Sequence, residues 1–135
     1  MTDNNNTKKL LVIPCGGVGK VQGLISREAA YHVTDKLLPN EADTVCLALL
    51  VTGDAETQQK VQQNPCVTLD GCPKLCAQKN VELSGGKIAQ AVRVYDVMKQ
   101  HRGANFGNAT VLSDEGWATV EELAGQVAQV AEQGL

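Results

Sequence analysis

Five cysteines are the residues of this sequence whose type and spacing could do chemistry. They are Cys15, Cys46, Cys66, Cys72 and Cys76. Thiolates bind zinc and iron–sulfur clusters, and a thiolate of lowered pKa is a nucleophile. The first nine residues are polar and unlike a secretory signal, so we expect a cytoplasmic protein whose thiols stay reduced. Metal binding or thiol chemistry is therefore expected, rather than a disulfide framework.

Cys72 and Cys76 form the most informative pair, at the predicted start of a helix. Residues four apart on a helix share one face, with Cβ atoms about 5 to 6 Å apart, which suits two ligands of one tetrahedral metal ion. Pro73 is suited to the first helical position. The positive end of the helix dipole would stabilise thiolates there. The alternative is a pair of small buried apolar residues at a helix start.

A glycine-containing loop follows Cys15. Its residues are Gly16, Gly17, Val18, Gly19 and Lys20. The loop departs from a phosphate-binding loop, because Val21 replaces the Ser or Thr that would bind magnesium and Pro14 replaces the first glycine. The glycines can instead bring backbone N–H groups close to an anionic metal–thiolate centre, to which Lys20 adds positive charge. A tight turn without a ligand is the alternative.

The other candidates carry weaker signals. Cys46 lies in an apolar segment, where both a core role and a ligand role are open. Cys66 opens a predicted strand about four residues before its end, so we expect it to be structural. Asp70 is expected to bind loop backbone or cap the helix rather than act as a base. Neither His32 nor His101 has a partner that the sequence identifies.

The elements that must position these residues alternate along the chain. Apolar or alternating runs predict strands at residues 10–13, 44–51, 66–69 and 91–97. Helical spacing predicts helices at residues 24–38, 55–63, 72–83 and 114–133. Ser113 is the expected N-cap of the last helix. This order is typical of a small three-layer α/β domain, with a mostly parallel sheet of about four strands and helices on both faces. We expect one domain at residues 10–135, after a disordered tail at residues 1–9.

Ligands of such sheets bind outside the carboxyl ends of the strands. Cys15 follows the first predicted strand, Cys72 follows the third, and Cys76 lies one helical turn further on. We therefore expect these three thiols at one edge of the sheet. Cys46 lies within the second predicted strand, and the sequence does not decide whether its thiol reaches that edge.

The composition excludes several classes of partner. The 135 residues contain 12 Lys and Arg against 15 Asp and Glu, a formal charge of −3, so no excess of cations is available for a phosphate backbone. Aromatic residues make up 3% of the chain, too few for a base-stacking surface. No apolar run approaches the roughly 20 residues that cross a bilayer. We expect a metal ion as the partner, without nucleic acid or membrane, and the sequence identifies no protein partner.

The segment VTLDGCPKLCA at residues 67–77 resembles the DGC-domain family, proposed zinc-binding proteins named after an Asp-Gly-Cys motif. Cys-Gly-Gly at 15–17, Cys-Leu-Ala at 46–48 and Gly-Gly-Lys at 85–87 extend the resemblance over about residues 10–97. The resemblance implies four metal ligands, which are Cys15, Cys46, Cys72 and Cys76. The residues expected around them are Gly16, Gly17, Lys20, Asp70 and Gly71. The stretch after Cys46 and the fifth thiol, Cys66, depart from the family pattern.

The leading interpretation is a cytoplasmic protein that holds one zinc ion with this cysteine cluster, and its physiological role is open. An iron–sulfur cluster is the alternative cofactor, because four thiolates serve both. The alternative function is a thiol redox or thiol-transfer enzyme, with Cys72 as nucleophile and Cys76 or Cys15 as resolving thiol. A third possibility is an open metal site that Cys46 does not join. Whether the protein is an enzyme therefore stays open at this point.

Overall fold

Four parallel strands form a single sheet in the computed structural model, which describes residues 9–15, 20–71 and 74–132. The strands are β1 (Leu10–Pro14), β2 (Ala42–Thr44), β3 (Pro65–Asp70) and β4 (Lys87–Arg93). Their order is β2-β1-β3-β4, so the chain moves from β1 to one side and then returns to the other. The carboxyl ends of β1 and β3 therefore border the switch point of the sheet, where α/β proteins bind ligands.

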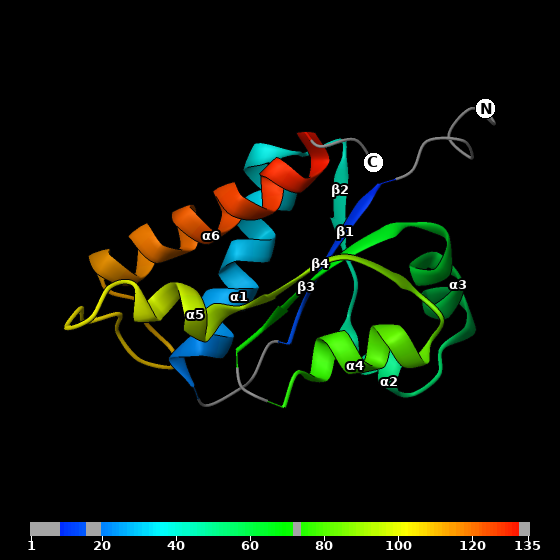
Figure 1. Ribbon diagram of the computed structural model, residues 1–135, viewed down its shortest axis with the longest axis horizontal. Helices are drawn as coiled ribbons and strands as arrows, with labels where there is room; N and C mark the ends of the chain where they lie inside the picture. Colours follow the sequence, from blue (N-terminus) through cyan, green and yellow to red (C-terminus); the bar gives the residue numbers. More distant parts are fainter. Residues whose placement is uncertain (1–8, 16–19, 72–73, 133–135) are drawn as a thin grey trace.

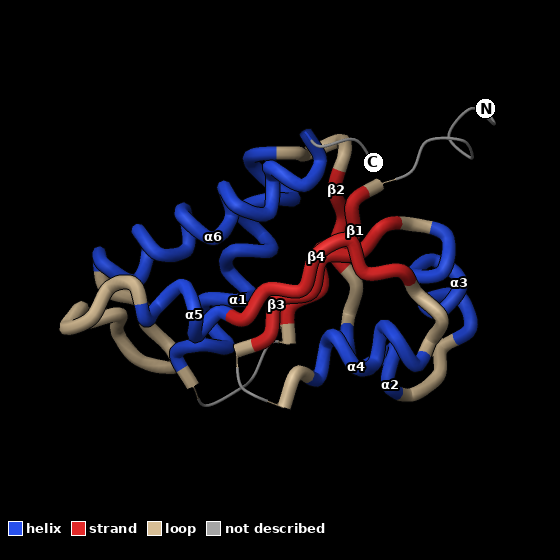
Figure 2. The backbone as a smooth tube through the Cα atoms, viewed as in Figure 1, coloured by secondary structure: helices blue, strands red, loops and turns tan. Residues whose placement is uncertain are grey.

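Helices cover both faces of the sheet (Figure 1, Figure 2). One face carries α1 (Val21–His32), its π-helical continuation η2 (Val33–Leu37), α5 (Val94–Lys99) and α6 (Asp114–Glu132). The other face carries α2 (Leu47–Val51), α3 (Ala55–Gln63) and α4 (Cys76–Leu83). This arrangement confirms the predicted three-layer α/β fold with a parallel sheet. No helix in the described part of the chain combines the length and apolar character needed to span a membrane.

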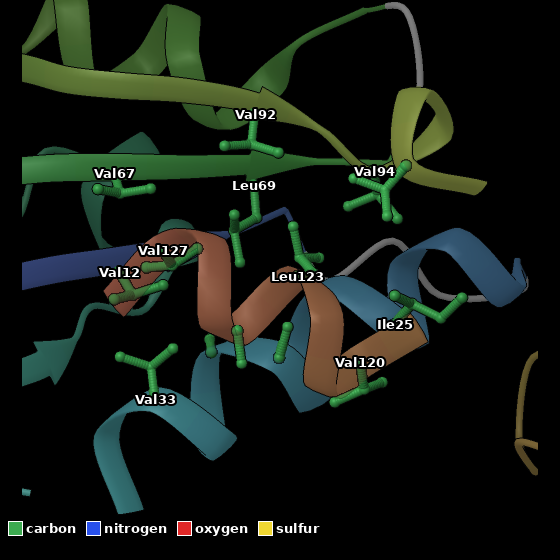
Figure 3. Packing of buried hydrophobic residues seen from close by; sticks show 14 of the residues in the cluster. Val12, Ile25, Val33, Val67, Leu69, Val92, Val94, Val120, Leu123 and Val127 are labelled. Atoms are coloured by element: carbon green, nitrogen blue, oxygen red, sulfur yellow. The ribbon is translucent and has the colours of Figure 1, made fainter. Parts of the chain in front are cut away.

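The core consists of two aliphatic clusters, one on each side of the sheet. Successive residues of a strand point to opposite faces, so Val12 of β1 belongs to the larger cluster and Ile13 belongs to the smaller one. Figure 3 shows the larger cluster, where Leu69 of β3 and Val12 lie against Leu123 and Val127 of α6. Burial on both faces explains why β1 is a continuous apolar run rather than an alternating one.

Two predicted strands are wrong in part, because each runs into a helix. The predicted strand at residues 44–51 is β2 only up to Thr44, after which Leu47–Val51 is α2. The predicted strand at residues 91–97 is the end of β4 followed by α5. Short apolar runs of this kind do not distinguish strand from helix. In α2 only Leu50 is fully buried, the pattern of a surface helix with a single inward-facing residue.

The long helices agree with their local signals. The helix predicted at residues 55–63 is α3, and α6 begins at Asp114 as predicted. The Ser113 hydroxyl accepts a hydrogen bond from the Gly116 N–H at 3.1 Å, which confirms Ser113 as the N-cap. The helix predicted from residue 24 begins at Val21 and continues through η2 to Leu37. Residues 1–8 of the predicted tail lie outside the described residues.

Candidate functional site

The described cysteines among the predicted ligands follow the carboxyl ends of strands. Cys15 comes directly after β1, and Cys76 opens α4 after β3. Cys46 lies two residues beyond Thr44, the last residue of β2, and not within a strand as predicted. Thr44 pairs with Val12, so extending this register by two residues brings Cys46 level with the end of β1. The shorter β2 therefore brings Cys46 to the same edge as Cys15.

A hydrogen bond joins the end of β1 to the Asp-Gly-Cys motif. The backbone N–H of Gly71 donates to Cys15 Sγ at 3.1 Å, and the Cys15 N–H donates to the Leu69 carbonyl at 2.9 Å. These contacts hold the sulfur of Cys15 beside the residue that precedes Cys72. An N–H group directed at the sulfur also fixes the direction of the Cys15 side chain.

Close packing against α1 explains the glycine of the motif. Gly71 is buried, and a Cβ atom added to it would lie 3.0 Å from the Gln22 Cβ and 3.1 Å from the Gln22 backbone carbon. Backbone atoms cannot move aside as a flexible side-chain tip can. The approach of α1 therefore favours a residue without a side chain at this position, because α1 would have to move slightly to admit a Cβ atom.

Asp70 joins β3 to α4 through its side chain. Its carboxylate accepts hydrogen bonds from the Ala77 N–H at 2.8 Å and the Gln78 N–H at 3.1 Å, and it is 2% exposed. Leu75, the residue before the helix, makes no side-chain cap and has φ +55°. Asp70 thus supplies from the strand the cap that the loop lacks, as predicted, and a negative charge at this helix terminus is stabilising. It also fixes where Cys76 begins the helix.

The predicted helix start at residue 72 is wrong. The helix α4 begins at Cys76, because the left-handed backbone of Leu75 interrupts the helical path before it. The described residues therefore confirm the predicted helix over residues 72–83 only from Cys76 onward. Cys72 and Pro73 lie outside the described residues.

The comparison with protein families gives one result. The family model of the DGC domain matches residues 11–127. The chain belongs to the DGC-domain family. Neither the curated proteins nor the solved structures contain a match.

In this DGC domain the first two motif residues have separate tasks. Asp70 caps α4, whereas Gly71 allows α1 to approach and donates its N–H to Cys15. The motif therefore ties β1, β3, α1 and α4 together at the switch point of the sheet. Its third residue, Cys72, is the predicted ligand.

Cys66 differs from the other described cysteines of the DGC domain. Cys46 and Cys76 are exposed and Cys15 is half-buried, whereas Cys66 is fully buried in the smaller core cluster. Burial raises the pKa of the Cys66 thiol to about 11. The thiol therefore stays protonated at neutral pH, in agreement with its expected structural role.

The described residues do not by themselves assemble a metal centre. Within residues 9–15, 20–71 and 74–132, no three His, Cys, Asp or Glu side chains are grouped so that they could hold an ion. Lys20 is exposed at the N-cap position of α1, while Gly16 and Gly17 lie outside the described ranges. The four-cysteine ligand set of the DGC domain stays a prediction.

Three contacts were not anticipated from sequence. Ser26 lies 3.8 Å from Cys15, measured from Oγ to Sγ, and Gln22 packs on Gly71. The signal that could have indicated them is their i, i+4 spacing on one face of α1, with a serine between apolar residues. His101, which had no recognisable partner, lies 2.6 Å from Glu122 between Nε2 and Oε1.

Proposed function

We propose that this DGC domain is a cytoplasmic zinc-binding protein that holds one ion at the carboxyl edge of its sheet. The ligands are Cys15, Cys46, Cys72 and Cys76. The observation that carries the proposal is the hydrogen bond from the Gly71 N–H to Cys15 Sγ. This hydrogen bond places Cys15 next to Gly71, the residue that precedes Cys72, although Cys15 and Cys72 are 57 positions apart in the chain.

Two further features support the same edge as the site. The register of β2 with β1 leads Cys46 to the end of β1, and the carboxylate of Asp70 fixes the start of α4 at Cys76. The helices that follow these two cysteines, α2 and α4, pack against each other. The three described cysteines of the proposed ligand set thus belong to chain segments that leave the sheet at one side.

The donor set fits zinc. Four thiolates suit its tetrahedral coordination, with Zn–S distances near ~2.3 Å, and a site closed by four protein ligands is normally structural. Bound zinc would crosslink the segments that follow β1, β2 and β3. The Gly71 N–H offsets part of the negative charge that the thiolates bring. A reducing compartment keeps the thiols free for the metal.

Elemental analysis tests this proposal directly. Untagged protein is purified under nitrogen without chelator, and its metal content and reactive thiols are counted together. We expect about one zinc per chain. Four thiols should be protected until a chelator is added, because the four cysteines are bound to the metal as thiolates. The matched variants are Cys15→Ser and Cys76→Ser, which should lose zinc, and Cys66→Ala, which should keep it.

Three results would contradict the proposal. Loss of zinc from Cys66→Ala as complete as from Cys15→Ser would show that the ligand set is wrong. Metal-free protein with a reactive Cys72, or one bridged to Cys76, would instead support the thiol redox or thiol-transfer alternative. Visible colour, with iron in place of zinc, would identify an iron–sulfur cluster on the same thiols.

A further inference from the structure

Ser26 is a buried hydroxyl beside a proposed ligand. It is 0% exposed on α1, and its Oγ lies 3.8 Å from Cys15 Sγ. The same hydroxyl donates to the Gly23 carbonyl at 2.8 Å. With its own proton engaged there, the Ser26 oxygen can accept the S–H of a protonated Cys15.

The face of α1 that carries Ser26 contacts both partners of the hydrogen bond described above. Gln22, one turn before Ser26, packs on Gly71, whose N–H donates to Cys15 Sγ. Ser26 then reaches the same sulfur from α1, whereas Gly71 reaches it from the end of β3. The sulfur of Cys15 is therefore flanked by two hydrogen-bonding groups from different elements.

We infer that Ser26 is a positioning residue that holds the Cys15 sulfur in its metal-binding orientation. The inference rests on the proposed function. Metal binding removes the thiol proton, which leaves the sulfur an acceptor only. Rotation about the Cβ–Oγ bond then lets the Ser26 hydroxyl release the Gly23 carbonyl and donate to the thiolate. Together with the Gly71 N–H it orients the ligand, as outer-shell groups do at metal sites.

The fold itself has little need of this hydroxyl. Its neighbours Leu24, Ile25 and Ala29 are buried apolar residues, and alanine forms helix better than serine does. The Gly23 carbonyl lies inside α1, where the N–H four residues further on also donates to it. Removing the hydroxyl therefore leaves no buried group without a partner.

The test compares Ser26→Ala with the control Thr119→Val. Thr119 is also a buried helical hydroxyl, and it donates to the Glu115 carbonyl at 2.9 Å in α6. Zinc affinity is measured by competition with a chromophoric chelator. We expect Ser26→Ala to bind zinc about 10- to 100-fold more weakly, and Thr119→Val to match the wild type. In the cobalt(II)-loaded protein, the thiolate charge-transfer band should move to longer wavelength in Ser26→Ala alone.

The outcomes separate this inference from the proposed function. Wild-type protein that binds no zinc or cobalt would overturn both. Wild-type protein that binds zinc, with a Ser26→Ala affinity within about twofold of it and an unmoved cobalt band, would overturn the inference alone. A lower Tm of the metal-free Ser26→Ala protein would mean that the substitution also affects the fold. Ser26→Thr is then tested instead, because it keeps a hydroxyl at the same position. Wild-type affinity in Ser26→Thr supports the inference, and a loss equal to that of Ser26→Ala contradicts it.

Discussion

The strand pair β1–β3 has a cysteine near each end, and the two sulfur atoms meet opposite surroundings. Near the start of β3, Cys66 is buried and lies 3.4 Å from the Asn64 carbonyl and 3.7 Å from the Val61 carbonyl. At the other end, Cys15 receives the Gly71 N–H. Burial and nearby carbonyl acceptors favour the protonated thiol at Cys66, whereas the Cys15 sulfur is half-buried and accepts a backbone N–H. Position along the strands, rather than residue type, thus decides which cysteine suits a metal.

Removal of the Asp70 carboxylate should have the largest effect on stability and zinc binding at the Cys15 end of the strand pair. In Asp70→Ala the buried Ala77 N–H loses its acceptor and α4 loses its cap, so we expect a loss of about 3 kcal/mol in the free energy of unfolding. Zinc affinity should fall as well, because the start of α4 at Cys76 is released. Urea unfolding and chelator competition measure the two effects.

Asp54→Ala is the control for this variant. Asp54 caps α3 by accepting the Thr57 N–H at 3.0 Å, and it is exposed. Its loss should weaken the N-terminus of α3 and leave zinc affinity unchanged. Equal loss of zinc affinity in both variants would refute a specific role of Asp70 at the cysteine edge.

A methyl group on Gly71 should have the next largest effect. The added Cβ meets the backbone and the Cβ of Gln22, so α1 or the motif must shift, at a cost of about 2 kcal/mol in the free energy of unfolding. Gly86→Ala is the matched control, because its Cβ would overlap the Val61 and Val81 side chains near Cys66. Both variants should be destabilised, but only Gly71→Ala should weaken zinc binding. Normal zinc binding in Gly71→Ala would contradict the proposal that the Cys15 end of the β1–β3 pair, and not the Cys66 end, binds the metal.

The Cys66 thiol should make stability depend on pH in the alkaline range. Its pKa is about 11 in the folded protein against 9.0 for an ordinary, solvent-exposed thiol, so the folded state holds this proton more tightly. The stability is complete below pH 9 and is lost as the pH rises towards 11, by roughly 2 kcal/mol. Unfolding by urea at pH 8.5 and at pH 11 measures the loss, which Cys66→Ala should not show. An equal alkaline loss in that variant would assign the effect to other groups.

A surface ion pair at the Cys66 end should matter least. Lys60 Nζ lies 2.7 Å from Asp43 Oδ2, and both side chains are more than 40% exposed. Partial burial of Asp43 by itself raises the pKa of its carboxyl group. The hydrogen bond from Lys60 outweighs this effect and holds the pKa below its usual value. We expect Lys60→Ala to lower the free energy of unfolding by less than about 1 kcal/mol, with zinc binding unchanged. A larger decrease in the free energy of unfolding, measured with urea, would show that this exposed ion pair contributes more to stability than expected.

Local signals were sufficient where an element is defined by its own residues. The apolar run of β1 and the cap at Ser113 identified their elements, because burial pattern and capping act within a few residues. They failed at Leu47–Val51, because a short apolar run is compatible with either a strand or a helix. They also failed at the start of α4, because no local signal indicated the left-handed backbone of Leu75, after which the helix begins at Cys76.

The sequence by itself determined the α/β layering, the family and the place of Cys15 after the first strand, but not that of Cys46 after β2. Only the tertiary structure decided that the Gly71 N–H meets the sulfur of Cys15 and that Ser26 lies beside it. The physical reason is distance along the chain. Gly71 and Cys15 are 56 residues apart, and they meet because β1 and β3 pair in one register. Pairing of parallel strands joins residues that a long crossover connection separates along the chain, so it becomes visible only in the assembled sheet.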